Sequence, residues 1–368
     1  MRGLFLACVV SCVLFQGATI LGCVVTDYSR VSIALKICET IILDNVYIPG
    51  GETLRLHLRD GAKLYFRGNT TFGHYAWSGP LVEITGTNVI IEGEENSILD
   101  GQGPLYWDKH GEWGVLKPKF FTIQLHNSSM NNIHVLNNPI QCVNLFNSSN
   151  VQLARWVIDA SSGDPEVVGV DNAGNNTDGF TIWNSTDVVL LDGVVHNQGD
   201  CVALRSGCNI LVDNMICYGG RGLTISVGFS DNIFAYNLLQ NITIKNSILE
   251  RGENGINIKT RVDGVIGLLR NITFENINFE GPTNYGINIE ENYMDLSPNS
   301  TLSSNAKTNT LILDLKLINI IGSVELTAVP IHILCVEDGC SEWTFTNVLV
   351  TGEKSNECNF EPEGFKCT

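Results

Sequence analysis

The stretch Asn176-Thr177-Asp178-Gly179, followed by Gln198-Gly199-Asp200-Cys201, decides the fold of this chain. Asp200 comes 22 residues after Asp178, and this offset is about the length of one coil of a solenoid. On stacked parallel strands the two carboxylates would project from neighbouring coils, roughly 4.8 Å apart. Two carboxylates facing one cleft suit the hydrolysis of a sugar chain, since one activates water and another protonates the leaving oxygen.

Short apolar runs recur on both sides of this stretch, each beginning with Asn or Asp and dominated by β-branched residues: 131–135, 150–153, 187–191, 209–212, 241–244 and 271–274. No long window has a helical period, and each run is too short to fold alone, so it must stack on its neighbours. Asn and Gly supply the tight corners, and asparagines at the same place on each coil would stack as a ladder. We therefore predict an all-β fold, a single right-handed parallel β-helix.

The chain begins Met1-Arg2 and is mostly apolar from Leu4 to Leu21, with small residues at Gly17 and Ala18. This pattern predicts a secretory signal peptide over residues 1–22 and a single β-helix domain over residues 23–368. A membrane anchor is the alternative, and we disfavour it because few charges follow the apolar segment. We expect a secreted, extracellular protein with no membrane partner.

The cysteines agree with an oxidising compartment. Two of the twelve, Cys8 and Cys12, belong to the predicted signal peptide. Eight of the others form four pairs close in sequence: Cys23/Cys38, Cys201/Cys217, Cys335/Cys340 and Cys358/Cys367. Cys142 and Cys208 are left over, either paired together or as buried thiols. No Cys-x-x-Cys or clustered His accompanies them, so we expect no metal site and no cofactor.

Glycosylation is expected from eight Asn-x-Ser/Thr sequences: Asn69, Asn127, Asn147, Asn175, Asn184, Asn241, Asn271 and Asn299. The net charge of −17 argues against a nucleic-acid partner. It also opposes a polyanionic ligand unless a local basic patch overrides the overall field. A capped β-helix buries its core without a partner, so we expect a monomer.

From about Cys23 onward the chain resembles the polygalacturonases and related pectin hydrolases of glycoside hydrolase family 28. Besides the two opening motifs, the resemblance is carried by Lys117-Pro118-Lys119-Phe120, Gly219-Gly220-Arg221-Gly222-Leu223, Gly255-Ile256-Asn257-Ile258-Lys259, and Tyr285-Gly286 leading to Tyr293. It implies a right-handed parallel β-helix, a cleft for galacturonan chains and disulfides at the four short-range cysteine pairs.

The resemblance assigns Asp178 and Asp200 to the pair that activates water. It gives Asn176, Asn257, Lys259 and Tyr293 to substrate binding. Three positions depart from the family pattern. Gly199 stands where the family has the aspartate taken as general acid, Arg221 replaces a histidine, and Asn257 replaces the arginine of an Arg-Ile-Lys motif.

These departures are unequal in their chemistry. Without a proton donor the leaving alkoxide is very poor, and loss of a positioned general acid lowers the rate by about 10² to 10⁴. Glu250 or Glu253 is a candidate replacement acid from a loop, although we favour a solvated turn as the explanation for both. Arg221 would either hold a substrate carboxylate or pair with Asp200, and both readings stay open. Asn257 carries no charge, so Lys259 alone would supply the positive charge that binds the substrate carboxylate.

Two functional classes follow. The first is a catalytically impaired family member that binds pectin chains or engages an inhibitor protein directed at active relatives. The second is a working pectin hydrolase with an altered acid. A secreted scaffold without a carbohydrate role is a third. The aromatic residues Tyr106, Trp107 and Trp113 would line the cleft rim or cap the core, and we favour the cap.

Overall fold

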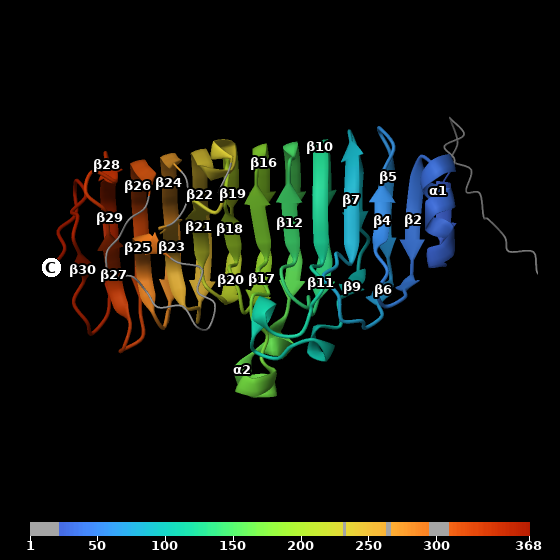
Figure 1. Cartoon of the computed structure of the whole chain (residues 1–368), viewed down its shortest axis with the longest axis horizontal. Coiled ribbons are helices and arrows are strands. Elements are labelled where there is room, and N and C mark those ends of the chain that lie inside the picture. The colour runs from blue at the N-terminus through green and yellow to red at the C-terminus, as the bar shows by residue number, and fades with distance from the viewer. Residues whose placement is uncertain (1–21, 231–232, 263–265, 294–308) are drawn as a thin grey trace, which may run out of the picture.

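The computed structural model describes residues 22–230, 233–262, 266–293 and 309–368. Its strands form one 30-stranded sheet in which every pairing between named strands is parallel, wound as a right-handed β-helix. The coils stack side by side along the long axis (Figure 1). The predicted fold class is therefore confirmed. No helix among the described residues is both long and apolar enough to cross a membrane.

The strands of each coil fall on three faces. The first face carries the sequence motifs, and its strands are β4 (Leu54–His57), β7 (Val82–Thr87), the start of β10 (Phe121–Asn131), β12 (Val143–Phe146), β15 (Phe180–Trp183), β18 (Val202–Leu204), β21 (Leu223–Val227), β23 (Asn254–Arg261), β25 (Tyr285–Tyr293), β27 (Val329–Leu334) and β30 (Glu357–Cys358).

The second face begins at the N-terminal end of the described chain and runs the length of the solenoid. Its strands are β1 (Gly22–Val25), β2 (Thr40–Asp44), β5 (Lys63–Arg67), β8 (Ile90–Gly93), the end of β10, β13 (Ser149–Ala154), β16 (Ser185–Leu191), β19 (Gly207–Asp213), β22 (Leu238–Glu250), β24 (Gly267–Glu280), β26 (Thr310–Ser323), β28 (Cys340–Ser341) and β29 (Thr344–Thr351).

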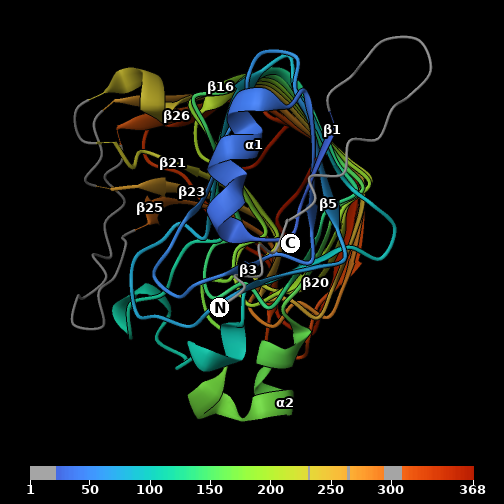
Figure 2. The same ribbon diagram turned by 90° about the vertical axis from the view of Figure 1, so that its right-hand side faces the viewer.

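The third face consists of shorter strands and, toward the C-terminus, the later parts of β22, β24, β26 and β29. The shorter strands are β3 (Tyr47–Ile48), β6 (Asn69–Phe72), β9 (Ile98–Asp100), β11 (His134–Leu136), β14 (Val157–Asp159), β17 (Val194–Asn197) and β20 (Ile216–Gly219). Figure 2 shows β20 on the side of the coil opposite β21, β23 and β25.

The helices are few and short. They are α1 (Val31–Ile37), α2 (Pro165–Val168) and the 3₁₀ helices η1 (Tyr28–Arg30), η2 (Gly103–Leu105), η3 (Gly111–Trp113), η4 (Ser161–Gly163), η5 (Val170–Asn172) and η6 (Phe234–Asn237). α1 covers the N-terminal opening of the solenoid (Figure 2). Without this helix the apolar core would be exposed at that end. The segment with α2 projects as a lobe beneath the first and third faces (Figure 1).

The interior of the coils is continuous and apolar. The fully buried Trp156 packs edge-on against Phe121 and Phe180 of neighbouring coils, with ring centroids 5.6 Å apart in both pairs. Such edge-to-face packing is the arrangement that aromatic pairs prefer. Five of the six predicted apolar runs lie inside strands on the second face. The run 131–135 is divided instead, because Asn132 at φ +56° turns the chain between β10 and β11.

Asparagine ladders form at the corners, as predicted. Along one corner the side-chain amides of Asn347, Asn319, Asn276 and Asn246 each donate to the residue one coil earlier, ending on Asp213. A second ladder joins Asn271, Asn241, Asn209 and Asp187. All of these except Asp213 have positive φ, between 52° and 57°. Asn and Asp tolerate this left-handed conformation better than other residues with a side chain, which explains their recurrence at the corners.

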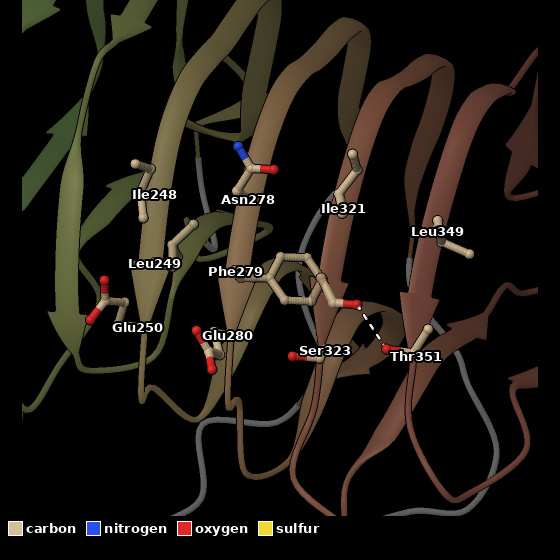
Figure 3. Close-up of a pocket in the computed structure, with 11 residues that line it drawn as sticks. Ile248, Leu249, Glu250, Asn278, Phe279, Glu280, Ile321, Ser323, Leu349 and Thr351 are labelled. Carbon is tan, nitrogen blue, oxygen red and sulfur yellow. Dashed lines mark hydrogen bonds between the residues drawn. The ribbon is translucent and has the colours of Figure 1, made fainter.

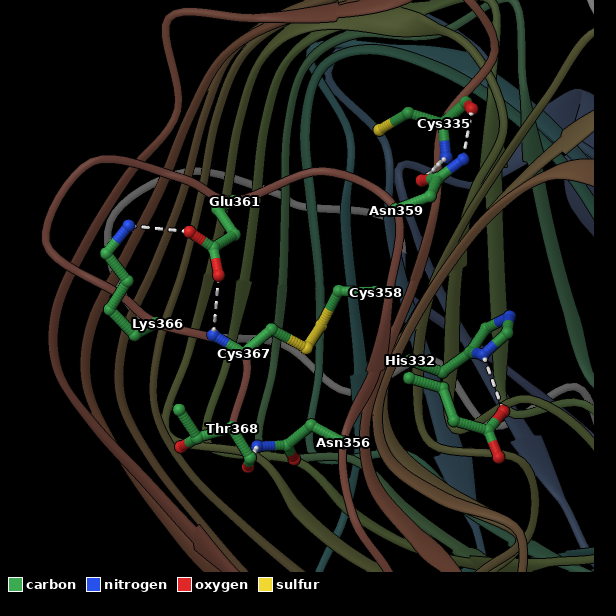
Figure 4. Close-up of a disulfide and its surroundings, with 10 residues drawn as sticks. His332, Cys335, Asn356, Cys358, Asn359, Glu361, Lys366, Cys367 and Thr368 are labelled. Carbon is green, nitrogen blue, oxygen red and sulfur yellow. Dashed lines mark hydrogen bonds and ion pairs between the residues drawn. A yellow bond between two sulfur atoms is a disulfide. The ribbon is translucent and has the colours of Figure 1, made fainter.

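The four predicted disulfides are present: Cys23–Cys38, Cys201–Cys217, Cys335–Cys340 and Cys358–Cys367. Cys142 is a buried thiol and Cys208 is half-buried, and neither is paired. The Cys358–Cys367 bridge closes the C-terminal segment over the last coil, where Glu361 also accepts from Lys366 at 2.6 Å (Figure 4). The predicted signal peptide and Asn299 lie outside the described residues, apart from Gly22.

Candidate functional site

The two aspartates of the opening motifs lie at the same corner of neighbouring coils. Asp178 stands two residues before β15 and Asp200 two residues before β18. The backbone N–H of Asp200 donates to Oδ1 of Asp178 at 3.0 Å. Both side chains are almost fully buried, with 3% and 5% of their surface exposed. The structure therefore joins the two aspartates through the backbone of the second coil.

Asn197 and Gln198 hold the two corners in place. The buried Nδ2 of Asn197 donates to the carbonyl oxygens of both Thr177 and Asp200 at 3.0 Å. Thr177 Oγ1 donates to Oε1 of Gln198 at 3.0 Å, and Gln198 Nε2 reaches Oδ1 of Asp164 in the lobe at 2.7 Å. Because these donors and acceptors satisfy one another, they fix the corner rather than offer themselves to a ligand.

Asp178 and Asp200 have different electrostatic surroundings. Burial, and then the Asp200 charge, raise the pKa of Asp178 from 3.8 to about 6, against the opposing effects of Arg221, Arg205 and the Asp200 N–H. Asp200 has more partners. Its Oδ1 accepts from Thr224 Oγ1 at 2.6 Å, and its Oδ2 lies 3.9 Å from Nζ of Lys259. In weakly acidic solution the site can therefore hold one proton on Asp178.

The backbone at Gly199 is pressed against Asp178. A Cβ atom on Gly199 would lie 2.2 Å from Oδ1 and 2.6 Å from the backbone nitrogen of Asp178. Contacts this short do not occur at real Cβ atoms, so this backbone has no room for any side chain at residue 199. The position that the family resemblance gives to a general acid is thus filled by the neighbouring coil.

Arg221 is held in a loop of glycines one coil further on. Gly219, Gly220 and Gly222 all have positive φ, between 67° and 95°, which glycine adopts without strain. Arg221 Nη2 donates to Oδ1 of Asn175 at 2.7 Å, and its Nε lies 3.7 Å from Oε2 of Glu253. Among the described residues its ion-pair partner is therefore Glu253. The direct pair with Asp200 considered from sequence does not form.

Asn257, Lys259 and Tyr293 lie on the strands that follow. Asn257 and Lys259 point outward from β23 and pair in register with Asn288 and Glu290 of β25. Asn257 accepts from Nδ2 of Asn288 at 3.1 Å, so its amide belongs to a buried amide row. Lys259 lies between Asp200 and the ring of Tyr293, with Nζ 4.7 Å from the ring centroid.

These side chains border a cavity of about 420 Å³ on the first face, also lined by Asn176, Arg221, Glu253, Glu290 and Trp113. The cavity brings together all four residues predicted to bind substrate. Trp113 corrects one sequence interpretation, because it is 57% exposed at the rim while Tyr106 and Trp107 are buried. It belongs to the short helix η3, which places its indole outside the solenoid.

Sequence reasoning missed two residues beside the aspartates. Thr224 was overlooked because a threonine within an apolar strand gives no functional signal, and Arg205 because it follows a strand outside any quoted motif. Arg205 acts electrostatically on Asp178, and its guanidinium lies 5.4 Å from the centroid of the Phe229 ring. Neither residue is in register with Asp178 and Asp200, since Thr224 pairs with Ala203 and Arg205 follows Leu204, so the sequence offered no signal for them.

Two other features carry no binding argument. Glu291, Cys335 and Cys340 lie within metal-ligand distance of one another, but the two sulfurs are joined in a disulfide. A shallow groove crosses the third face, with Ile248, Asn278, Ile321 and Leu349 side by side on four strands (Figure 3). It lies on a different face from the aspartates.

Comparisons with known proteins show to which family the chain belongs. Residues 38–367 match the model of the glycosyl hydrolases family 28. The chain is 39% identical over 350 residues to a probable endopolygalacturonase A of Aspergillus fumigatus, covering 94% of this chain and 91% of that protein. The chain belongs to glycosyl hydrolase family 28.

Two further comparisons place the chain within family 28. A polygalacturonase of Phaedon cochleariae is 36% identical over 352 residues, covering 94% of this chain and 93% of that protein. The fold matches that of endopolygalacturonase I from Stereum purpureum, solved with two galacturonate molecules. The TM-score is 0.80 and the identity 27%, over 92% of this chain and 96% of that one.

Proposed function

We propose that this family 28 protein is a secreted, pectin-binding member whose hydrolysis of galacturonan is impaired. The observation that carries the proposal is Gly199, where the neighbouring Asp178 occupies the space that a side chain would need. Hydrolysis must protonate the leaving oxygen on one face of the glycosidic bond while water attacks the other. The family resemblance puts both Asp178 and Asp200 on the water side of that arrangement, and residue 199 offers no carboxyl for the other side.

Residues for binding are nevertheless retained. Lys259 offers a cation, while Tyr293 and Trp113 offer aromatic surface to a sugar chain at a cavity of about 420 Å³. Asn176, Asn257 and Asn288 add amides. In ligand sites, a few placed polar groups beside aromatic surface fix the orientation of the bound molecule.

A working hydrolase with an altered acid is the second candidate. It is supported by the pKa of about 6 at Asp178, since a carboxyl that holds its proton in weakly acidic solution can donate one. Glu253 is the less suitable donor because its carboxylate pairs with Arg221 at 3.7 Å. Glu250 lines a neighbouring cavity of about 740 Å³ and not the one beside Lys259.

The test of the proposal is retention on insoluble de-esterified galacturonan, compared with retention on insoluble cellulose as a neutral control. Retention on galacturonan alone, without release of soluble reducing ends, supports a binding protein. Retention with reducing ends released at rates ordinary for polygalacturonases supports the second candidate. No retention would contradict pectin binding, and a pull-down with an inhibitor protein of polygalacturonases would then test the predicted protein partner.

A further inference from the structure

A row of polar residues crosses the first face from the N-terminal coils and ends at the two aspartates. Phe121, Val143, Phe180 and Val202 pair in register on consecutive coils. The residues two positions earlier, Lys119, Gln141, Asp178 and Asp200, therefore lie in one row. Ladder bonds support this register, because Phe120 N donates to Gln141 O at 3.0 Å and Cys142 N to Asp178 O at 2.7 Å.

Arg205 reaches this row from the far end of β18. Its guanidinium is anchored over Phe229, whose ring packs 5.9 Å from that of Tyr293. Its Nε is buried, and no residue that the structure describes accepts a hydrogen bond from this atom. A buried donor without an acceptor is unfavourable, so the position is suited to a ligand that supplies one.

Lys119 and Gln141 complete the environment. Desolvation and the Arg205 guanidinium lower the pKa of Lys119, with Glu112 and Asp178 acting in the opposite direction. Neither cation lies in an ion pair with a described carboxylate within 4.0 Å. Gln141 is 8% exposed, and its Oε1 is a buried acceptor without a described donor. Gln141 thus carries an unused acceptor one coil from Lys119 in this row, and Arg205 is close enough to act on Lys119 electrostatically.

We propose that Lys119, Arg205 and Gln141 form a second uronate subsite, separate from the one at Lys259. The carboxylate of one galacturonate residue would lie between the two cations, and a hydroxyl of the same sugar would donate to Gln141. Arginine suits this role because its planar guanidinium contacts both carboxylate oxygens. The inference rests on the proposed pectin binding, and it supplies the local basic patch that a chain of net charge −17 needs for a polyanion.

The experiment is calorimetric titration of the full-length secreted protein with galacturonate oligomers, either de-esterified or fully methyl-esterified. Arg205→Gln and Lys119→Gln each remove one cation of the subsite. Lys63→Gln is the matched control, because Lys63 is an exposed lysine on β5 of the second face. Each variant is first shown to be folded by its thermal unfolding. Lys119 is exposed, so its replacement tests the inference even if Arg205→Gln is unstable.

We expect both subsite variants to bind de-esterified oligomers about tenfold or more weakly than wild type, as for a lost charge-assisted contact. Binding of methyl-esterified oligomers should change less than twofold, and Lys63→Gln should match wild type. Unchanged binding in both variants, with loss only in Lys259→Gln, would overturn the subsite and leave pectin binding intact. No binding of either oligomer by wild type would overturn the proposed function and the subsite together.

Discussion

Gly199 lies so close to Asp178 that a Cβ atom on it would be 2.6 Å from the Asp178 backbone nitrogen. Gly199, at the position that the family resemblance gives to the acid, therefore has no space for a side chain between these two coils. Restoring the side chain requires the backbone of two neighbouring coils to separate. The proposed loss of the acid therefore rests on the packing around Gly199 as well as on the sequence.

Gly199→Ala should lower the free energy of unfolding by about 1–3 kcal/mol, as for overpacking at a rigid contact. Gly199→Asp alone should be destabilised at least as much and should not restore hydrolysis. Thermal unfolding and reducing-end assays check both variants. A Gly199→Asp protein as stable as wild type would show that the coils separate freely at this corner.

The contribution of Asp178 to stability should fall as pH rises from about 4 to 6. Asp178 binds its proton more tightly in the folded state, where its pKa is about 6, than in the unfolded state, where it is 3.8. Ionisation in this window therefore favours the unfolded state, and the difference amounts to roughly 2–3 kcal/mol at most.

Asp178→Asn should remove this part of the pH dependence and unfold at a higher temperature than wild type at pH 7. The substitution keeps an oxygen for the Asp200 N–H. Unfolding is measured between pH 4 and 7, with Glu95→Gln at an exposed turn as the control. If Asp178→Asn keeps the wild-type slope, another group is responsible.

The asparagine ladder should contribute measurably to stability at Asn276. This residue donates to Asn246 at 2.9 Å, accepts from Asn319 at 3.1 Å, and has φ +54°. Asn276→Ala removes both bonds and strains the backbone, so we expect about 1–3 kcal/mol less stability.

Asn276→Gly separates the two causes, because glycine accepts the positive φ but makes no ladder bonds. Urea unfolding of both variants should place Asn276→Gly between wild type and Asn276→Ala. Equal stability of wild type and Asn276→Ala would mean that the ladder is incidental to the corner.

Asn175 should carry no glycan, although its sequence permits one. Its Nδ2 donates to Lys109 O at 2.8 Å and its Oδ1 accepts from Arg221 at 2.7 Å. A sugar on this amide would disturb both contacts at the cavity wall. Glycopeptide mass spectrometry of the protein secreted from a eukaryotic host should find Asn175 unoccupied and the exposed Asn69 occupied. Full occupancy at Asn175 would contradict the packing described for the loop.

The fold was predictable because each coil repeats the same chemistry. Asn and Asp at left-handed corners and β-branched runs between them are local signals. They predict a solenoid without any knowledge of contacts between coils. The division of the run 131–135 was not predictable, because Asn132 turns the chain where the apolar pattern continues. A corner asparagine and a strand asparagine look alike in one sequence.

The site was predictable only in part. Motif residues such as Asp178 and Lys259 were found from their motifs, whereas Gln141 lies beside Asp178 only through the register between coils that are far apart in sequence. Arg205 follows the opposite end of its strand and acts on Asp178 through its long side chain. The partner of Arg221 could not be read from sequence either. Glu253 and Asp200 are both acidic and close to Arg221 in the coil stack. The structure shows that Arg221 pairs with Glu253.

The central claim is that the chain lacks an effective proton donor for glycosidic cleavage. The most direct test is the release of reducing ends from de-esterified polygalacturonate by the wild-type protein, from about pH 4 to 8, which spans the carboxyl and histidine titrations. The account predicts rates at least about 10² below those of an active polygalacturonase assayed in parallel. Rates equal to those of the active enzyme would contradict it, and a maximum below pH 6 would point to Asp178 as the acid.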